Sequence, residues 1–133
     1  MNVNMTPELW LLACSAILGI VQIIISSHSA SLQRGYQWAA SSRDGSTPPL
    51  TGVAGRLERC FRNFLETFPL FAAMVFIAHL TNKHNWMTVW GAHLYFWARL
   101  LYIPLYAFGV PLIRSLVWNV ATLGIVLIFV SLF

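Results

Sequence analysis

The sequence predicts an all-α integral membrane protein whose chain forms a bundle of four transmembrane helices. Of the 133 residues, 58% are hydrophobic and only 9% are charged, and the mean hydropathy is +0.68. Soluble domains usually carry about 25% charged residues, so this composition excludes an ordinary soluble protein. A bilayer core about 30 Å thick requires roughly 20 apolar residues per helix, and the chain has four runs of that kind.

The expected helices fill the chain as a single domain, residues 1–133, with little room for a separate soluble unit. We expect the helices at about residues 7–34, 56–81, 86–108 and 113–133. Thr6 and Pro7 are typical of a helix start, because threonine is a good N-cap and proline suits the first helical position. No Lys or Arg precedes the first run, so it lacks the basic region of a secretory signal and is expected to be retained.

The one long connection, residues 27–55, is polar and rich in turn residues such as Gly45, Pro48 and Pro49. We expect it to cross the membrane surface without regular structure. The alternative is that the first helix extends further, through Arg34 and Trp38.

Basic residues predict the orientation of the chain in the membrane. The first and third connections carry Arg34, Arg43 and Arg114, whereas Lys83 is the only Lys or Arg in the middle connection. Cytoplasmic connections carry an excess of Lys and Arg. The first and third connections are therefore expected in the cytoplasm, with both termini on the opposite side.

The second expected helix carries an unusual set of polar residues for a membrane span: Arg59, Arg62, Asn63 and Glu66. Their spacing of i, i+3, i+4 and i+7 puts them on one face of a helix. Ionisable groups inside a membrane are costly and usually mark a site. This face therefore requires a partner helix or a ligand.

The third expected helix carries a complementary face, formed by Arg99, Tyr102 and Tyr106 at i, i+3 and i+7. A guanidinium buried alone would be very unfavourable. We therefore expect Arg99 to pair with Glu66 through a charge-assisted hydrogen bond. The remaining arginines then exceed the carboxylates, which favours an anionic ligand that the tyrosine hydroxyls also contact.

These residues also have simpler interpretations. The charged and amide groups of the two faces would serve equally well as an interhelical network that fixes the register of an oligomer. Tyrosines in membrane helices commonly serve packing, and Arg114 at a helix end is typical of a topology anchor.

Three motifs resemble the signature of the MAPEG superfamily, the membrane-associated proteins of eicosanoid and glutathione metabolism. The first runs from Arg59 through Asn63 and Glu66 to Phe71, the second spans residues 98–106, and the third is Ile113-Arg114-Ser115. The resemblance covers nearly the whole chain. It implies a four-helix protomer assembled as a homotrimer in the membrane lipid, with glutathione as a cosubstrate held at the protomer interfaces.

The resemblance also implies roles for individual residues. The positions that match glutathione contacts are Arg59, Asn63, Glu66, Arg99, Tyr102 and Tyr106. Arg62, on the same helix face, adds to the positive charge available to the two glutathione carboxylates, and Arg34 resembles a basic residue that joins the pocket in some members. Arg114 matches the arginine that stabilises the glutathione thiolate, and Ser115 is expected to donate a further hydrogen bond.

The chain departs from the family pattern at three positions. Phe61 stands where several mammalian members have Gln or His, Thr67 replaces a tyrosine of the leukotriene-forming branch, and Tyr102 replaces a histidine of the prostaglandin-synthase branch. Eicosanoid isomerisation is therefore not inferred. The expected activity is a glutathione transferase or peroxidase that acts on lipophilic electrophiles entering from the bilayer.

Two alternatives come from other functional classes: a non-catalytic lipid-binding protein on the same fold, and an accessory subunit of a larger membrane complex. We expect no metal, because the four histidines are scattered and no pair has ligand spacing with a carboxylate or cysteine. His93 is expected to bond a neighbouring helix. Cys14 and Cys60 lie near opposite ends of their helices, which argues against a disulfide. No nucleic-acid motif is present.

Overall fold

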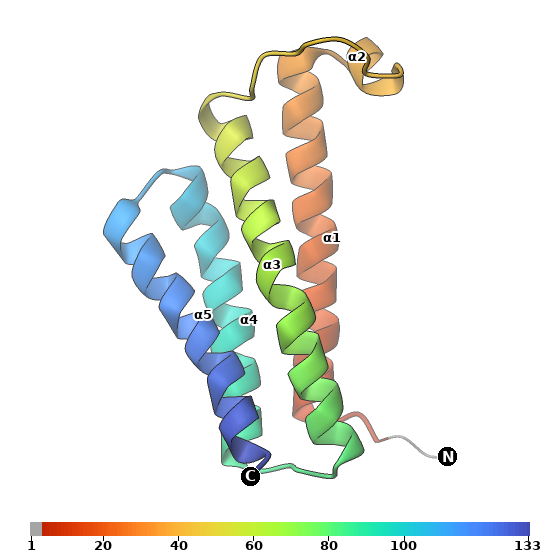
Figure 1. The fold of residues 1–133 in the computed structure, drawn as a ribbon. Helices are drawn as coiled ribbons and strands as arrows, with labels where there is room; N and C mark the ends of the chain where they lie inside the picture. Colours follow the sequence, from red (N-terminus) through yellow and green to blue (C-terminus); the bar gives the residue numbers. More distant parts are fainter. Residues whose placement is uncertain (1–3) are drawn as a thin grey trace.

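The computed structural model describes residues 4–133 as four long helices and one short helix, with no strand in that range (Figure 1). The helices are α1 (Pro7–Arg34), α2 (Tyr36–Ala40), α3 (Gly52–Leu80), α4 (Trp86–Ala107) and α5 (Pro111–Ser131). The long helices run alternately in opposite directions, so α1 begins at the same end of the bundle at which α5 ends (Figure 1). The α1–α3 and α4–α5 connections lie together at the other end.

Local sequence explains where the helices start. The Thr6 hydroxyl accepts a hydrogen bond from the Leu9 backbone N–H at 3.4 Å, with Pro7 at the first position of α1, as predicted. Asn85 caps α4 through a capping box with Thr88, in which each side chain bonds the backbone of the other residue. Pro111 opens α5.

The connection between α1 and α3 is more ordered than expected. α1 stops at Arg34 because Gly35 adopts a φ of 95°, and Trp38 belongs to the separate short helix α2. α3 begins at Gly52, four residues before the predicted position. The Gln33 side chain exchanges hydrogen bonds with the Thr51 backbone, which holds Thr51 as the N-cap of α3.

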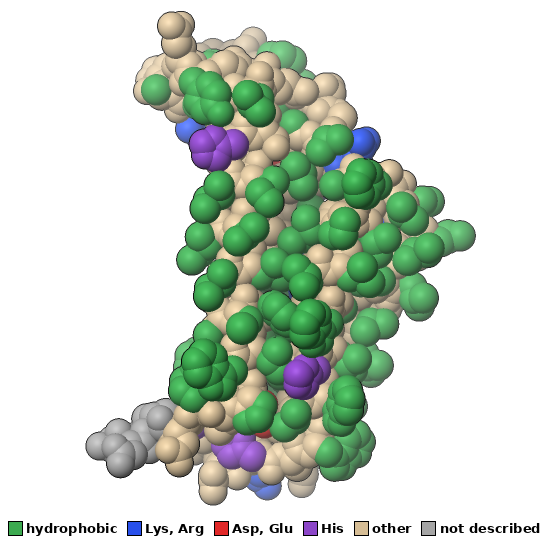
Figure 2. All heavy atoms as spheres, turned by 180° about the vertical axis from the view of Figure 1, so that it is seen from behind, with side chains coloured by type: hydrophobic (Ala, Val, Ile, Leu, Met, Phe, Trp, Pro, Cys, Tyr) green, Lys and Arg blue, Asp and Glu red, His purple; other side chains and the backbone are tan. Residues whose placement is uncertain are grey.

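Of the four long helices predicted as membrane spans, three have the length and hydropathy of a span within residues 4–133. α1, α3 and α5 are each long and apolar enough to cross a membrane. α4 is of similar length, 22 residues, but it is less hydropathic because it contains His93, Arg99 and several Trp and Tyr residues. Hydrophobic side chains cover most of the face shown in Figure 2, where Lys and Arg are visible mainly near the two ends. This distribution is typical of a protein whose middle lies in lipid.

The middle of the bundle consists of α3 and α4, with α1 packed against both of them on one side and α5 on the other. Within residues 4–133, α1 and α5 do not touch. α4 and α5 approach most closely at Gly91 and Gly124, where a Cβ added to Gly124 would lie 2.5 Å from the Gly91 carbonyl oxygen. Small residues at such a crossing allow two membrane helices to pack backbone against backbone.

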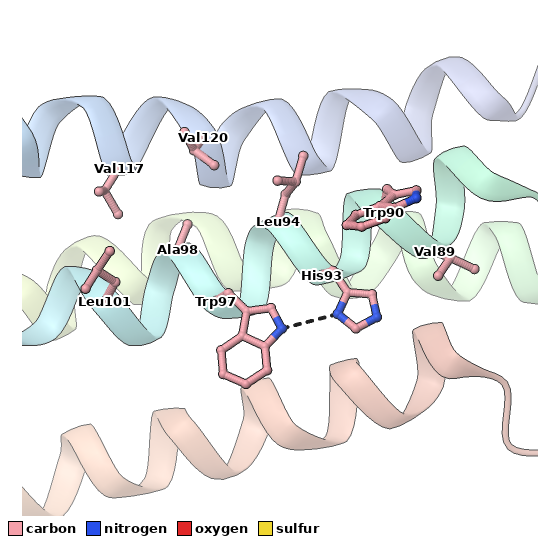
Figure 3. A pocket seen from close by; sticks show the side chains of 9 residues that line it. All are labelled: Val89, Trp90, His93, Leu94, Trp97, Ala98, Leu101, Val117 and Val120. Carbon is pink, nitrogen blue, oxygen red and sulfur yellow. Dashed lines mark hydrogen bonds between the residues drawn. The ribbon is translucent and has the colours of Figure 1, made fainter.

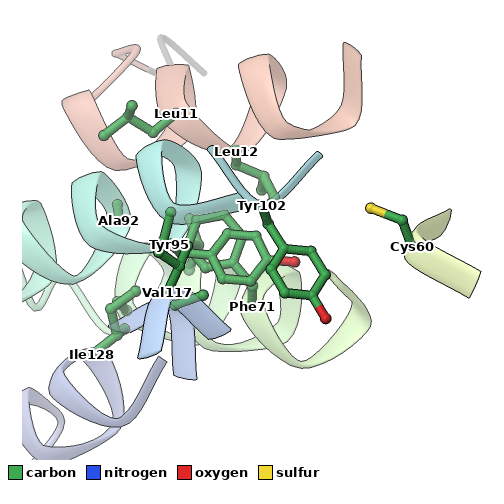
Figure 4. Close-up of a cluster of buried hydrophobic side chains, with 13 residues drawn as sticks. Leu11, Leu12, Cys60, Phe71, Ala92, Tyr95, Tyr102, Val117 and Ile128 are labelled. Carbon is green, nitrogen blue, oxygen red and sulfur yellow. The ribbon is translucent and has the colours of Figure 1, made fainter. Parts of the chain in front are cut away.

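The contact between α3 and α4 is aromatic. The rings of Phe71 and Tyr95 stack with centroids 4.0 Å apart, and the Tyr95 hydroxyl bonds the Thr67 hydroxyl at 3.0 Å. Figure 4 shows these rings in the middle of the buried cluster, with Leu11 and Leu12 of α1 and Ile128 of α5 around them. The core therefore joins all four long helices.

A compact polar group lies at the end of the bundle where α1 begins; we call it the Glu8 cluster. Glu8 is only 3% exposed. One of its carboxylate oxygens accepts a hydrogen bond from the Thr88 hydroxyl and lies 3.4 Å from His84 Nδ1. The cluster ties the first turn of α1 to the start of α4, and no cavity opens onto it among those described for residues 4–133.

Candidate functional site

A small polar cavity, which we call the polar cavity, lies between α3, α4 and α5 near the end where α5 begins. Its volume is about 210 Å³. It is lined by Asn63, Tyr102, Arg114, Ser115, Trp118 and Asn119. The first four of these were predicted as site residues from three separate motifs. The fold thus brings together residues up to 52 positions apart, counted from Asn63 to Ser115.

Arg114 and Ser115 lie near the N-terminus of α5, which begins at Pro111. The half-buried Arg114 guanidinium lies 4.5 Å from the centroid of the Tyr106 ring, which is a cation–π distance. The exposed Ser115 hydroxyl donates to the Pro111 carbonyl at 3.2 Å. A guanidinium, a hydroxyl and the positive end of a helix dipole all favour an anion at this position.

Arg99 forms the wall behind the cavity. It is 1% exposed, and its Nη1 donates to Asn63 Oδ1 at 2.7 Å. Its guanidinium carbon lies 4.5 Å from the Tyr102 ring centroid and 5.6 Å from that of Phe64. Arg99 does not line the cavity itself, but it fixes the orientation of Asn63 and Tyr102, which do.

The predicted ion pair between Arg99 and Glu66 is wrong. The ion pairs among residues 4–133 are Arg62 with Glu58, at 4.0 Å, and His84 with Glu8. Glu66 is exposed on α3 and lies about one turn beyond Asn63. Asn63 is closer to the buried side of the helix, and it satisfies Arg99 as a neutral acceptor.

The four polar residues of α3 do not act as one face. Arg59, Arg62 and Glu66 are exposed, and only Asn63 turns into the bundle. On an ideal helix, at about 100° per residue, Asn63 lies at one edge of the arc that the four residues span. The buried surface of α3 meets that edge, so the other three side chains remain on the surface of the bundle.

Arg34 lies apart from the polar cavity. It lines a separate hollow of about 290 Å³, together with Trp38 and Phe61, where α1 meets α2 and α3. Its Nη2 donates to the Pro48 carbonyl at 3.3 Å, and its guanidinium carbon is 4.9 Å from the Trp38 ring centroid. Within the described chain, Arg34 does not join the other predicted site residues.

The histidines and cysteines do not gather into a group with metal-ligand geometry in the described part of the chain. Residues 4–133 contain no group of three His, Cys, Asp or Glu side chains that could hold a metal ion, and Cys14 and Cys60 are both free. The expectation that His93 bonds a neighbouring helix is wrong. Trp97 Nε1 donates a hydrogen bond to His93 Nδ1 at 3.2 Å, and Trp97 lies one turn further along the same helix.

Comparison with known proteins identifies the family. The family model described as "MAPEG family" matches residues 11–133, which is most of the chain. The chain belongs to the MAPEG family. No curated protein matches it. The family has a helical membrane fold and includes glutathione transferases together with other membrane proteins, so this chain is an integral membrane protein.

Two residues of the cavity in this MAPEG protein were not predicted as site residues. Trp118 Nε1 is buried, and no partner is found for it among residues 4–133. Asn119 Nδ2 donates to the Ser115 carbonyl at 2.9 Å, which leaves its Oδ1 available. Trp118 follows Arg114 by four residues, and Asn119 follows Ser115 by four. This i+4 spacing on one helix could have identified both as neighbours of the predicted site residues. A tryptophan at position 118, near the start of the last predicted helix, also fits the pattern of a membrane-interface aromatic.

Proposed function

We propose that this MAPEG protein binds glutathione at the polar cavity and acts as a glutathione-dependent transferase or peroxidase on lipophilic electrophiles in the membrane. The observation that carries the proposal is the polar cavity itself. In a largely apolar molecule, three helices bring an arginine, a serine, two amides, a tyrosine and a tryptophan with an unpartnered indole N–H around one small space. Tyr102 is buried and most of the others are half-buried or exposed, and polar groups gathered within an apolar bundle are unfavourable unless they have a partner or a ligand.

Arg114 supplies the chemistry in this proposal. A free thiol has a pKa of about 8.5, so it is mostly protonated at neutral pH. A guanidinium beside the sulfur favours the thiolate, which is the nucleophilic form. Its contact with Tyr106 holds Arg114 at the mouth of the cavity, and the exposed Ser115 hydroxyl is free to turn from Pro111 and donate to the sulfur. The thiolate then forms a C–S bond to an electrophilic carbon as the leaving group departs.

The proposal includes a homotrimer. The polar cavity, about 210 Å³, is smaller than the roughly 300–1,000 Å³ of typical small-molecule sites, so one protomer offers only part of a site for a tripeptide. Arg59, Arg62 and Glu66 are exposed on α3 where they would otherwise meet lipid, which is costly. An interface between protomers would cover them, bring the arginines to the glutathione carboxylates, and allow a neighbour's Arg34 to join the pocket.

The basic residues also support an orientation. Arg34 ends α1, Arg43 and Arg56 lie in the α1–α3 connection and the first turns of α3, and Arg114 lies in the first turn of α5. These parts of the chain are at the same end of the bundle (Figure 1), the end that holds the polar cavity. By the positive-inside tendency, this end faces the cytoplasm and both termini lie on the other side.

One observation favours a second candidate function. Arg99 is buried, Glu66 is exposed, and neither lines the polar cavity, so two of the residues expected to hold glutathione do not reach it within the protomer. A non-catalytic lipid-binding protein, or an accessory subunit of a larger membrane complex, would need only the fold and its packing.

The deciding experiment measures thiolate formation by ultraviolet absorption when the purified protein in detergent is mixed with glutathione. Wild type is compared with Arg114→Ala and with Lys83→Ala, which removes an exposed charge from the opposite end. We expect the signal in wild type and in Lys83→Ala and its loss in Arg114→Ala. Turnover of 1-chloro-2,4-dinitrobenzene should fall in Arg114→Ala by about 100-fold.

Two results would contradict the proposal. If wild type gives no thiolate at saturating glutathione, the non-catalytic candidates replace it. If Arg114→Ala retains both the signal and turnover, the role given to Arg114 is wrong.

A further inference from the structure

A second and larger cavity lies on a different face of α4 from the polar cavity; we call it the apolar groove. Its volume is about 610 Å³. α4 lines most of it, through residues that include Trp90, His93, Trp97 and Leu101, and α5 adds Val117 and Val120. Figure 3 shows it along α4, with α5 on one side and α1 on the other. Arg99 and Tyr102, on the polar side of α4, do not line it.

His93 is the distinctive polar group in this groove. Trp97 Nε1 donates to His93 Nδ1 at 3.2 Å (Figure 3). An indole nitrogen can only donate, so Nδ1 must be the acceptor and cannot carry a proton. The ring is therefore the neutral tautomer with its proton on Nε2. Trp97 thus fixes His93 as a hydrogen-bond donor.

The structure gives the Nε2–H of His93 no hydrogen-bond partner among residues 4–133. Apart from the bonded His93–Trp97 pair, the groove lining is apolar or aromatic. His93 is seven residues into α4, which is about 10 Å along the helix axis from Trp86. Water is scarce at that depth, and a donor without an acceptor there is unfavourable.

These observations limit the chemistry of a ligand. A carbonyl oxygen would satisfy the Nε2–H and bring no donor of its own into the hydrocarbon, whereas a hydroxyl would leave its proton to be satisfied. The Trp90 ring centroid lies 6.0 Å from that of His93, and Trp90 and Trp97 are 60% and 56% exposed. Two indoles at the opening suit a planar ring. The ester carbonyls of phospholipids lie at the membrane interface, and His93 lies deeper than that.

We propose that the apolar groove is a second binding site, distinct from the polar cavity, for a membrane-dissolved lipophile with a ring carbonyl, such as an alkylated quinone or an aryl ketone. His93 Nε2–H donates to the carbonyl, the indoles of Trp90 and Trp97 contact the ring, and the alkyl tail lies along Leu101 and Val117. The proposal does not depend on glutathione binding.

The test uses 4-decylbenzophenone, whose ketone is both the hydrogen-bond acceptor and the photoreactive group. The protein is reconstituted in vesicles of diether phosphatidylcholine, irradiated with increasing probe, and digested for mass spectrometry. We expect saturable labelling within residues 89–101 and 117–120. In His93→Phe, which keeps a ring of similar size, half-saturation should need about three- to tenfold more probe. His28→Phe, on α1 and outside the groove, is the matched control and should behave as wild type.

Competition on the wild type makes the test independent of how the variants fold. 2-Decyl-1,4-benzoquinone should displace the probe at lower concentration than decylbenzene, which has no carbonyl. The proposal is overturned if the two competitors are equal, if His93→Phe binds the probe as wild type does, or if labelling is spread evenly over all lipid-facing helices. It is also overturned if diester vesicles abolish labelling, because the occupant would then be the bilayer phospholipid.

Discussion

The two polar regions of the bundle, the Glu8 cluster and the polar cavity, differ in how their buried charged residue is hydrogen-bonded and in whether a described cavity lies beside it. One Glu8 carboxylate oxygen accepts a hydrogen bond from Thr88 at the start of α4 and lies beside His84 in the loop before it. None of the cavities described for residues 4–133 is lined by Glu8. Arg99 has one side-chain hydrogen bond, to Asn63, and stacks on aromatic rings beside an open cavity.

The difference between the two regions is whether a described cavity lies beside the polar groups. Glu8, Thr88 and His84 bond one another across the contact between α1 and α4, although Glu8 Oε2 is buried without a partner within residues 4–133. At the polar cavity, the buried Trp118 indole N–H also has no partner in the described part of the chain. Both regions therefore hold a buried polar atom without a partner, but only the second has a described cavity beside it that could take a ligand.

The largest effect should come from removing the partner of Arg99. Asn63→Leu leaves a buried guanidinium without its acceptor, so we expect the free energy of unfolding to fall by about 3–5 kcal/mol. Denaturation in detergent, followed by circular dichroism, measures this change. Arg62→Leu, at an exposed neighbouring position, is the control and should change stability by less than about 1 kcal/mol.

A double variant tests the cause. Asn63→Leu combined with Arg99→Met removes the charge as well as its partner, and most of the lost stability should return. If the double variant is no more stable than Asn63→Leu alone, the loss has another origin and Arg99 is not the group that Asn63 satisfies.

A smaller effect is expected at the other region. Glu8→Ala removes a charged acceptor from Thr88 and His84, and hydrogen bonds to charged groups contribute about 1.5–3 kcal/mol each. We expect a loss of about 2 kcal/mol in the free energy of unfolding, with thiolate formation by glutathione unchanged in the folded protein. Loss of the thiolate signal in a folded Glu8→Ala protein would end the distinction between the two regions.

The smallest effect on stability should come from Trp118→Phe. Because the indole N–H has no partner within residues 4–133, its removal should change the free energy of unfolding by less than about 1 kcal/mol. If that N–H serves a ligand, the dissociation constant for glutathione should rise about three- to tenfold in calorimetric titration. Trp86→Phe, at an exposed position near the far end, should leave it unchanged; equal affinities in all three proteins would remove Trp118 from the site.

The sequence was sufficient for the fold and for the family. Composition and run length predicted the long membrane helices, and the Thr6–Pro7 start was confirmed because capping depends on neighbouring residues alone. The partner of Arg99 was predicted wrongly for a different reason. Spacing along α3 shows that Asn63 and Glu66 share a side of the helix, but it does not show how far that helix is rotated toward α4.

The same limit explains the unpredicted cavity residues. A tryptophan near the end of a membrane helix satisfies the interface pattern whether it faces lipid or a neighbouring helix, so the sequence did not distinguish these positions for Trp118. The structure decides between them through packing, which depends on residues distant in the sequence. The assignment of every site residue to glutathione, Arg34, Arg59 and Arg62 included, stays a prediction.

The close approach of Gly91 and Gly124 limits how the bundle can change shape. With backbone against backbone, a rotation or sliding of α4 along α5 would drive main-chain atoms into each other, and even one added methyl group would lie within 3 Å of main-chain atoms on the facing helix. We therefore expect α4 and α5 to keep their relative position. Any helix movement that widens the polar cavity is then expected to come from α3, and it would have to break the hydrogen bonds from Asn63 to Arg99 and from Thr67 to Tyr95.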